Sequence, residues 1–497
     1  MKKIFFVFVL ILCTKNIFAD SPFQGYSYNH WGRLVPAPAA YAPSRTFVAG
    51  DICETLGEFN NPSAIHVAPD ETIFVVDKNN NRIVGFDREL NLRIVIEKFI
   101  RNGKEDSLNL PNSVFVTPNG DLYIADTSNR RVVILDADGN FLREITAPVV
   151  DGLEDNFAFL PMHVVVGRSG RVLVIVARVY EGIMSFDPHG NFIGYFGTIP
   201  VNASPIEVLW RYFMTQEQRA VQMRFIPTEF QSMALDEFGF VFTTNLQPWA
   251  SDDQVMRLNP RGEDVIVNFN EEVGINGDQH FHPTGAELAG PSRFEDIIAR
   301  SHGKFSTLDV TRGRVYTYDS EGNMLYVFSG RVSGGTLHGM SDRPVAIESI
   351  GEDIMILDAG RGRILYFEPT EYGRLINSAI AARFRGDEDE AVSFWRELVQ
   401  LDENYIMAWS GIGRAFLAAG ENEEAMYYLQ RGMDFHHYSI AFRRHRIDVL
   451  HNALPKVLTG TVIILILFFL TKFLKSSRGL RPRTPTNFFE KKFDKKL

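Results

Sequence analysis

Short apolar runs recur along residues 61–368, and Gly, Asn, Asp or Pro bounds each of them. The runs are rich in Val, Ile, Phe and Tyr, a composition typical of antiparallel strands joined by tight turns. Three runs make one unit. The segment 61–87 reads NPSAIHVAPDETIFVVDKNNNRIVGFD, and the same pattern returns at 110–136. Further copies occupy 160–187, 226–259, 290–319 and 343–368, so the sequence contains six units.

A fourth apolar run follows several units, for example at 93–99 and 191–196. Four-stranded units repeated about every 40–50 residues predict the blades of a β-propeller, because one blade cannot bury both of its faces alone. We therefore expect a mainly β fold with a six-bladed propeller over residues 45–370. The last unit has no clear fourth strand, and residues 45–53, ahead of the first unit, could supply it and close the ring.

A repeated acidic–basic pair marks four of the six units. The pairs are Asp77/Arg82, Asp126/Arg131, Asp309/Arg314 and Asp358/Arg363. With the surrounding Pro…Val-Ala-Asp-Thr-x-Asn-x-Arg-Val pattern, the chain resembles the NHL-repeat family, which implies a propeller fold. Units three and four depart from it, with Val176 and Glu181 in one and Asn245 and Gln254 in the other. A pair repeated in four blades is expected to be architectural, with Asp bonding the backbone of the turn, rather than catalytic.

Two insertions are expected to decorate one face of the propeller. The prolines that open the units lie 49, 50, 66, 64 and 53 residues apart, so units three and four are each followed by extra residues. In a four-stranded blade this connection emerges on the same face as the turn between strands two and three. The first insertion, 204–223, carries two capping boxes and an apolar stripe with Trp210 and Phe213. The stripe either packs on the propeller rim or covers a partner or ligand.

The second insertion contains a His-x-His pair, His280 and His282. Such a pair can bind a metal when a carboxylate or a third His joins it, and the sequence shows no third ligand. With Trp210 and Phe213, these histidines are the candidate residues for binding a ligand or partner. We assign no catalytic residue, no metal ligand and no cofactor from the sequence.

The period changes over residues 371–452, where helical patterns replace strands. The segments RGDEDEAVSFW (385–395) and AGENEEAMYYL (419–429) match 34 residues apart, which resembles tetratricopeptide repeats. Two such repeats and a following helix at about 438–452 offer only a shallow groove, around Trp395 and Trp409. The segment is either a spacer between the propeller and a membrane or a second surface for a protein partner.

Two segments predict contact with a membrane. Residues 1–19 combine a basic tip, an apolar run and a small residue, Ala19, as in a secretory signal peptide, and 20–44 would follow as a linker. Residues 454–474 enclose the uncharged run Val457–Thr471, and at 1.5 Å per residue they reach roughly 31 Å, enough to span a bilayer. The basic tail 475–497 is expected in the cytoplasm, which places the body outside it as a single-pass membrane protein.

The distribution of charge excludes one class of partner. The net charge of the chain is −10. Residues 1–19 carry a charge of +3 and residues 472–497 a charge of +7, so residues 20–471 carry −20. So acidic a body argues against nucleic-acid binding, which needs basic surface to neutralise phosphates. Of the two cysteines, Cys13 lies in the signal segment, so the exported chain would hold Cys53 alone and no disulfide.

Two functional hypotheses remain open. In the first, the protein is a membrane-anchored, extracytoplasmic binding or scaffold protein that recognises a protein or a small ligand. In the second, it is a metal-dependent hydrolase or lyase of the gluconolactonase-like or amidating-lyase-like kind, with its site in the central channel. The innermost strands offer His66, His163, Glu229 and Glu295 to such a site, but in dissimilar registers. We favour the first hypothesis, because every recognisable module is an interaction module.

Overall fold

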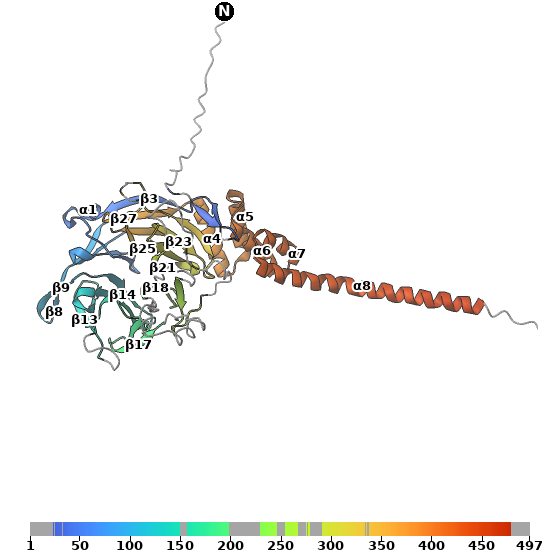
Figure 1. Cartoon of the computed structure of the whole chain (residues 1–497), viewed down its shortest axis with the longest axis horizontal. Coiled ribbons are helices and arrows are strands. Elements are labelled where there is room, and N and C mark those ends of the chain that lie inside the picture. Colours follow the sequence, from blue (N-terminus) through green and yellow to red (C-terminus); the bar gives the residue numbers. More distant parts are fainter. Residues whose placement is uncertain are drawn as a thin grey trace, which may run out of the picture. The chain divides into compact units, whose positions relative to one another are not determined.

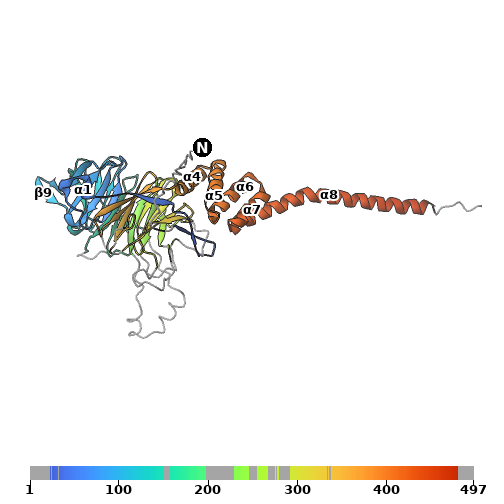
Figure 2. The same ribbon diagram turned by 90° about the horizontal axis from the view of Figure 1, so that it is seen from above.

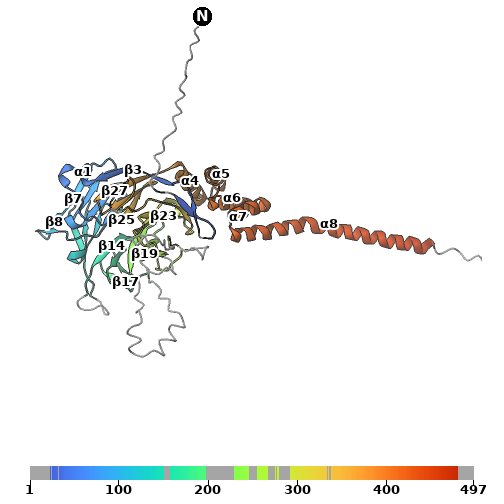
Figure 3. The ribbon, with the colours of Figure 1, turned by 45° about the horizontal axis from the view of Figure 1, so that its top comes forward.

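The computed structural model describes residues 23, 25–31, 33–149, 157–197, 229–245, 254–266, 275, 277–278, 291–332, 334 and 337–478 (Figure 1). The chain divides into two units, Met1–Gly411 and Ile412–Leu497. The first unit contains a six-bladed β-propeller, as the repeats predict (Figure 3).

Each blade is an antiparallel sheet whose strands follow one another outward from the centre. Blade one consists of β4 (Ala64–Val67), β5 (Ile73–Asp77), β6 (Arg82–Phe86) and β7 (Leu92–Ile96). Blade two consists of β10 (Ser113–Val116), β11 (Leu122–Asp126), β12 (Arg131–Leu135) and β13 (Phe141–Ile145). Blade three consists of β14 (Pro161–Val166), β15 (Val172–Val176), β16 (Ile183–Phe186) and β17 (Phe192–Phe196).

The described part of blade four holds β18 (Phe230–Leu235), β19 (Val241–Asn245) and β20 (Val255–Leu258). Blade five consists of β21 (Phe294–Ala299), β22 (Phe305–Asp309), β23 (Arg314–Tyr318) and β24 (Met324–Phe328). Blade six consists of β25 (Pro344–Ile350), β26 (Asp353–Asp358), β27 (Arg363–Pro369) and, from ahead of blade one, β3 (Tyr41–Val48). Among the described residues, two hairpins lie outside the blades: β1 (Tyr26–Tyr28) pairs with β2 (Leu34–Pro36), and β8 (Lys98–Arg101) pairs with β9 (Lys104–Ser107).

The ring closes through β3, as expected from the missing fourth strand of the last unit. β3 pairs antiparallel with β27, from Tyr41 opposite Pro369 to Val48 opposite Arg363. The strand begins four residues earlier than the predicted 45–53 and stops at Val48, because residues Ala49–Ile52 form the short helix α1. This turn is helical because the Asp51 carboxylate accepts a hydrogen bond from the Val48 amide while Ala49 and Ile52 are buried.

The hydrophobic core lies between blades rather than inside any one of them. All five side chains of β5 are buried, and so are those of β11 and β15, because each middle strand packs against a neighbouring blade on both faces. The cluster between blades six and one contains Phe47 and Phe86. A strand buried on both faces needs a continuous apolar run, which explains why the runs do not alternate with polar residues.

The repeated Asp–Arg pairs are architectural in blades one, two and six. Asp77, for example, accepts hydrogen bonds from Arg82 Nε at 2.8 Å and from the Asn60 amide at 2.7 Å. The backbone partner of Asp77 therefore lies in the segment that enters the first strand, whereas Asp358 of blade six also accepts a hydrogen bond at 3.2 Å from the Gly360 amide, in the turn as expected. In blade five Asp309 keeps the backbone bond, from the Arg293 amide, but Arg314 turns instead to Asp278 at 2.5 Å.

Helices follow the last blade: α4 (Glu371–Arg385), α5 (Glu388–Leu401), α6 (Ile406–Ala419), α7 (Asn422–Arg431) and α8 (Phe435–Arg478). The Thr370 side chain caps α4, and Gly386, at a φ of 81°, ends it. The separate helix expected at about 438–452 is instead the first half of α8, which continues through Pro455. Proline removes one backbone hydrogen bond and its ring crowds the carbonyl four residues earlier, so Pro455 weakens α8 at this point although the helix continues through it.

Helix α4 packs on the propeller around a buried polar cluster (Figure 2). Arg300 donates to the Tyr41 hydroxyl at 2.9 Å and to Glu352 at 2.9 Å. Lys304, which has no exposed surface, also donates to Glu352, and Asn377 of α4 bonds both Glu352 and Tyr41. Burial lowers the pKa of Lys304 to about 8. Arg300, Lys304 and Glu352 belong to turns between first and second strands, so α4 covers the face opposite the turns between second and third strands.

One helix among the described residues is long and apolar enough to cross a membrane. It is Phe435–Ser476, with a mean hydropathy of 2.4 over its most apolar window and no burial of that window. The helix fits the expected single-pass anchor. The predicted signal segment, residues 1–19, lies outside the described part of the chain.

The closure strand yields a matched pair of substitutions. Phe47→Ala removes a side chain that is buried between blades six and one, and we expect it to lower the free energy of unfolding by about 3–5 kcal/mol. Val48→Ala, on the next and exposed residue of β3, should cost about 0.5 kcal/mol or less. Chemical unfolding of the full-length protein in detergent measures both, and equal effects would show that β3 does not close the ring.

Candidate functional site

The four residues that the sequence offers as binding residues, Trp210, Phe213, His280 and His282, all lie outside the described part of the chain. They stay predictions. Besides the cluster under α4, polar side chains of the described residues gather in the central channel and in a pocket at the seam between blades six and one.

The channel is lined by the six innermost strands, and each of these contacts its neighbours round the ring. His66 of β4 lies beside Glu348 of β25, with 3.4 Å between Nδ1 and Oε2, and its ring lies 5.2 Å from that of Phe115 on β10. Glu348 also accepts a hydrogen bond from the Val67 amide at 3.2 Å. These contacts join blades six, one and two at the axis.

A second group joins blades four, five and six. Asp296 of β21 accepts hydrogen bonds from the Ser232 hydroxyl at 2.5 Å and from the Ile347 amide at 2.8 Å. Burial raises the pKa of Asp296 to about 6, and the nearby charge of Glu348 acts in the same direction. Burial, with the His66 ring beside it, lowers the pKa of His163 to about 4, so that this imidazole is neutral at pH 7.

The four channel residues named from the sequence are not brought together. His66 and His163 are neighbours, but the carboxylate of Glu229 accepts a hydrogen bond from the Arg178 amide, in the turn after β15. Burial raises the pKa of Glu295, whose carboxyl is influenced by Arg293 rather than by either histidine. Within the described ranges, no three His, Cys, Asp or Glu side chains are placed to hold one metal ion. The carboxylates that do approach the axis, Asp296 and Glu348, were not singled out in the sequence.

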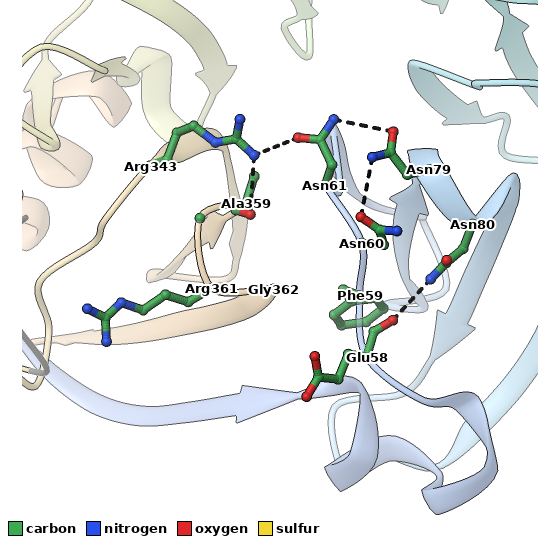
Figure 4. Close-up of a pocket in the computed structure, with 11 residues that line it drawn as sticks. Glu58, Phe59, Asn60, Asn61, Asn79, Asn80, Arg343, Ala359, Arg361 and Gly362 are labelled. Atoms are coloured by element: carbon green, nitrogen blue, oxygen red, sulfur yellow. Dashed lines mark hydrogen bonds between the residues drawn. The ribbon is translucent and has the colours of Figure 1, made fainter. Parts of the chain in front are cut away.

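The seam pocket lies between the second-to-third-strand turns of blades six and one and has a volume of about 770 Å³ (Figure 4). Three segments line it: Glu58–Asn61, which enters blade one; Asn79 and Asn80 of the turn η2 (Lys78–Asn80); and Ala359–Gly362 with Arg343 from blade six. Its volume falls in the range of sites for small molecules, but its lining is polar, which is unusual for such sites.

A directed chain of hydrogen bonds crosses the mouth of the pocket. Arg343 donates to Asn61 Oδ1 at 2.6 Å, Asn61 donates to Asn79 at 3.5 Å, and Asn79 donates to Asn60 at 3.3 Å. In Figure 4 these side chains point toward one another, while the guanidinium of Arg361 points away from them. The two amide–amide bonds are long, so they are weak and a ligand could replace them at little cost.

Comparison of blades one and two separates architecture from what is special to this pocket. Asn80 bonds Asp77 and the Glu58 carbonyl, and Asn129 of blade two bonds Asp126 and the Ser107 carbonyl in the same way. Asn80 is therefore a structural residue. The seam between blades one and two has Leu110 and Ser128 at the positions of Asn61 and Asn79, so these two asparagines belong to the pocket alone.

The pocket is open because blade six has small residues in its turn. Ala359 follows the blade-six Asp as Lys78 follows the blade-one Asp. Lys78 reaches across its own seam to Asn112 at 2.8 Å, whereas the short side chain of Ala359, which lines the pocket, cannot reach across the blade-six seam. Sequence reasoning missed this site, because asparagine and glycine between apolar runs are also the ordinary residues of turns.

The chain matches no protein-family model, and no curated protein matches its sequence. Among solved structures, a catalytically inactive virginiamycin B lyase from Staphylococcus aureus with quinupristin has a TM-score of 0.38 at 13% identity, over 70% of this chain and 88% of that one. A gluconolactonase from Xanthomonas campestris has a TM-score of 0.38 at 12% identity, over 67% of this chain and 97% of the gluconolactonase. The extracellular domain of a putative one-component system from B. thetaiotaomicron has a TM-score of 0.33 at 13% identity, over 61% of this chain and 32% of that one. Similarity this low assigns no activity.

The division between architectural and pocket asparagines can be tested by stability. Asn80→Ala and Asn129→Ala should each lower the free energy of unfolding by about 1–3 kcal/mol, because a buried Asp and a backbone carbonyl lose their donor. Asn79→Ala, on an exposed side chain next to Asn80, should change it by less than about 0.5 kcal/mol. Thermal and chemical unfolding measure all three, and a destabilising Asn79→Ala would make that residue structural too.

Proposed function

We propose that the protein is a membrane-anchored, extracytoplasmic binding protein whose propeller takes a small, neutral, hydroxyl-rich ligand in the seam pocket. The observation that carries this proposal is the lining of the pocket. Carboxamides from Asn60, Asn61 and Asn79 each offer N–H donors beside a carbonyl acceptor, as neighbouring hydroxyl groups require. Glu58 adds an acceptor and Arg343 adds donors, so the pocket suits a carbohydrate better than an apolar ligand or a phosphate.

The remaining parts of the proposal concern placement and partners. Strands β17 and β18, which flank the first insertion, have their connected ends on the face that holds the pocket, so Trp210 and Phe213 would lie on the ligand side. Helices α4 to α7 resemble tetratricopeptide pairs, and Gly413 supports this, because a Cβ there would approach Leu429 to 2.6 Å. We propose that these helices hold a protein partner, with α8 as the anchor.

An enzyme at the channel is the second candidate function. Asp296, whose pKa burial raises to about 6, is a group of the kind that transfers protons near neutral pH, and the His66–Glu348 pair lies on two innermost strands that follow one another round the ring. The same groups join blades to one another, which gives them a structural use. Because no third metal ligand accompanies them among the described residues, we rank this function below ligand binding.

Ligand binding can be tested with an array of neutral mono- and oligosaccharides and the full-length protein in detergent. Ala359→Lys copies the residue that reaches across the neighbouring seam, so it should abolish saccharide binding without unfolding the propeller. Asn61→Leu combined with Asn79→Ala should weaken binding at least about tenfold, because two hydrogen-bonding groups are lost. Ser128→Ala, at the blade-two equivalent of Asn79, is the matched control and should bind normally. Absence of any retained saccharide, or normal binding by Ala359→Lys, would exclude the pocket as a saccharide site.

Orientation is tested separately. A reporter enzyme that is active only in the cytoplasm, fused after Leu497, should be active in cells. Protease added outside cells that have been freed of any outer barrier should cut the propeller. An inactive fusion together with a protected propeller would reverse the proposed orientation.

A further inference from the structure

The first half of α8, residues 435–453, is a surface helix that leads directly into the apolar run. At 1.5 Å per residue it is about 28 Å long. One side of it is occupied. Ala441 is buried in a cluster with Leu417, Ala425 and Leu429, and the Arg444 guanidinium donates to the Leu417 carbonyl at 3.3 Å. Asp448, on the same side, accepts a hydrogen bond from Asn422.

The opposite side combines apolar and basic residues. A helix advances 100° per residue, so Phe442, Arg446, Val449, Leu450 and Arg443 fall within one arc of about 120°, turned away from Ala441. The three apolar side chains of this arc are 48–53% exposed. Arg443 and Arg446 are exposed too, and no ion pair or hydrogen bond involves either guanidinium in the described part of the chain. We call these five residues the basic–apolar face.

The sign of its charge sets this part of the chain apart from the rest of the body. Residues 20–434 carry −23, whereas residues 435–471 carry +3, from Arg443, Arg444, Arg446 and Lys456 against Asp448. An acidic body is repelled by an anionic bilayer surface, while a basic segment beside the span is attracted to it by about 1 kcal/mol per Lys or Arg. Apolar side chains interleaved with arginine are the composition of helices that lie in a membrane interface.

We propose that the basic–apolar face binds the anionic phospholipid surface next to the membrane anchor. Arg443 and Arg446 would contact headgroup phosphates, and Phe442, Val449 and Leu450 would enter the boundary between headgroups and acyl chains. Pro455 lies between this face and the apolar run, and its missing N–H interrupts the backbone hydrogen bonds there, so the helix can bend toward the surface at that point. The packed side then stays with α7, away from the lipid. The proposal requires the anchor but is independent of any saccharide in the seam pocket.

The test uses the full-length protein in nanodiscs of phosphatidylcholine with or without phosphatidylglycerol. A fluorophore is attached at Leu450→Cys in a Cys53→Ser background, and brominated lipids quench it if it enters the bilayer surface. Asn452→Cys, exposed on the other side of the same helix, is the matched control. We expect strong quenching at 450, weak quenching at 452, and dependence on the anionic lipid. Replacing Arg443 and Arg446 by Gln should reduce surface binding roughly 25-fold, about fivefold for each arginine.

Three outcomes would overturn this proposal. Equal quenching at 450 and 452 would show that the helix presents no particular side to the lipid. Quenching that is the same in both lipid mixtures would exclude recognition of anionic headgroups. The face would belong to a second copy of this chain if two observations coincided. Energy transfer would occur between fluorophores on two copies in one nanodisc, and the brominated lipids would not quench the fluorophore at position 450.

Discussion

The pairing of β3 with β27 is the constraint on which the rest of the propeller depends. Strands of the other blades come from consecutive segments, but this pair joins residues 41–48 to residues 363–369, from opposite ends of the repeat. Without it, β27 would present an unpaired edge, and the apolar cluster around Phe47 would lie open to water. Propeller blades are separate sheets that keep only short, protected edges, and the register of backbone hydrogen bonds between β3 and β27 joins the two ends of the repeat in one blade.

Both ends of β3 also build features beyond the ring. After its last residue the chain turns through α1 and enters blade one along Glu58–Asn61, beside the blade-six turn, and the seam pocket lies there. At its first residue, the Tyr41 hydroxyl donates to the Glu352 carbonyl and accepts from Arg300 and Asn377, which fixes α4 on the opposite face. One strand thus positions the candidate ligand site and the start of the helical segment together.

The sequence predicted the features that repeat. Six units, their strands, the closure of the ring and the structural use of the Asp–Arg pairs follow from self-comparison, because each blade faces the same packing problem. The start of β3 was misplaced, since Pro43 argues against a strand interior and is tolerated only on an outer strand. The seam pocket and the Arg300–Glu352 cluster could not be predicted. Both join residues far apart in the sequence, and both depend on departures from the repeat, such as Ala359 where blade one has Lys78.

The most direct test uses the protein with β3 (Tyr41–Val48) deleted and the rest of the chain retained. Hydrogen exchange of this variant shows whether one strand controls ring closure, the seam pocket and the docking of α4. We expect β27, residues 58–61 and α4 to lose protection together, while blades two and three keep most of theirs, because they pack against each other and neither contributes to the cluster around Phe47. If α4 and residues 58–61 stayed as protected as in the intact chain, the pocket and the docking of α4 would be independent of ring closure. That result would contradict the central role of β3.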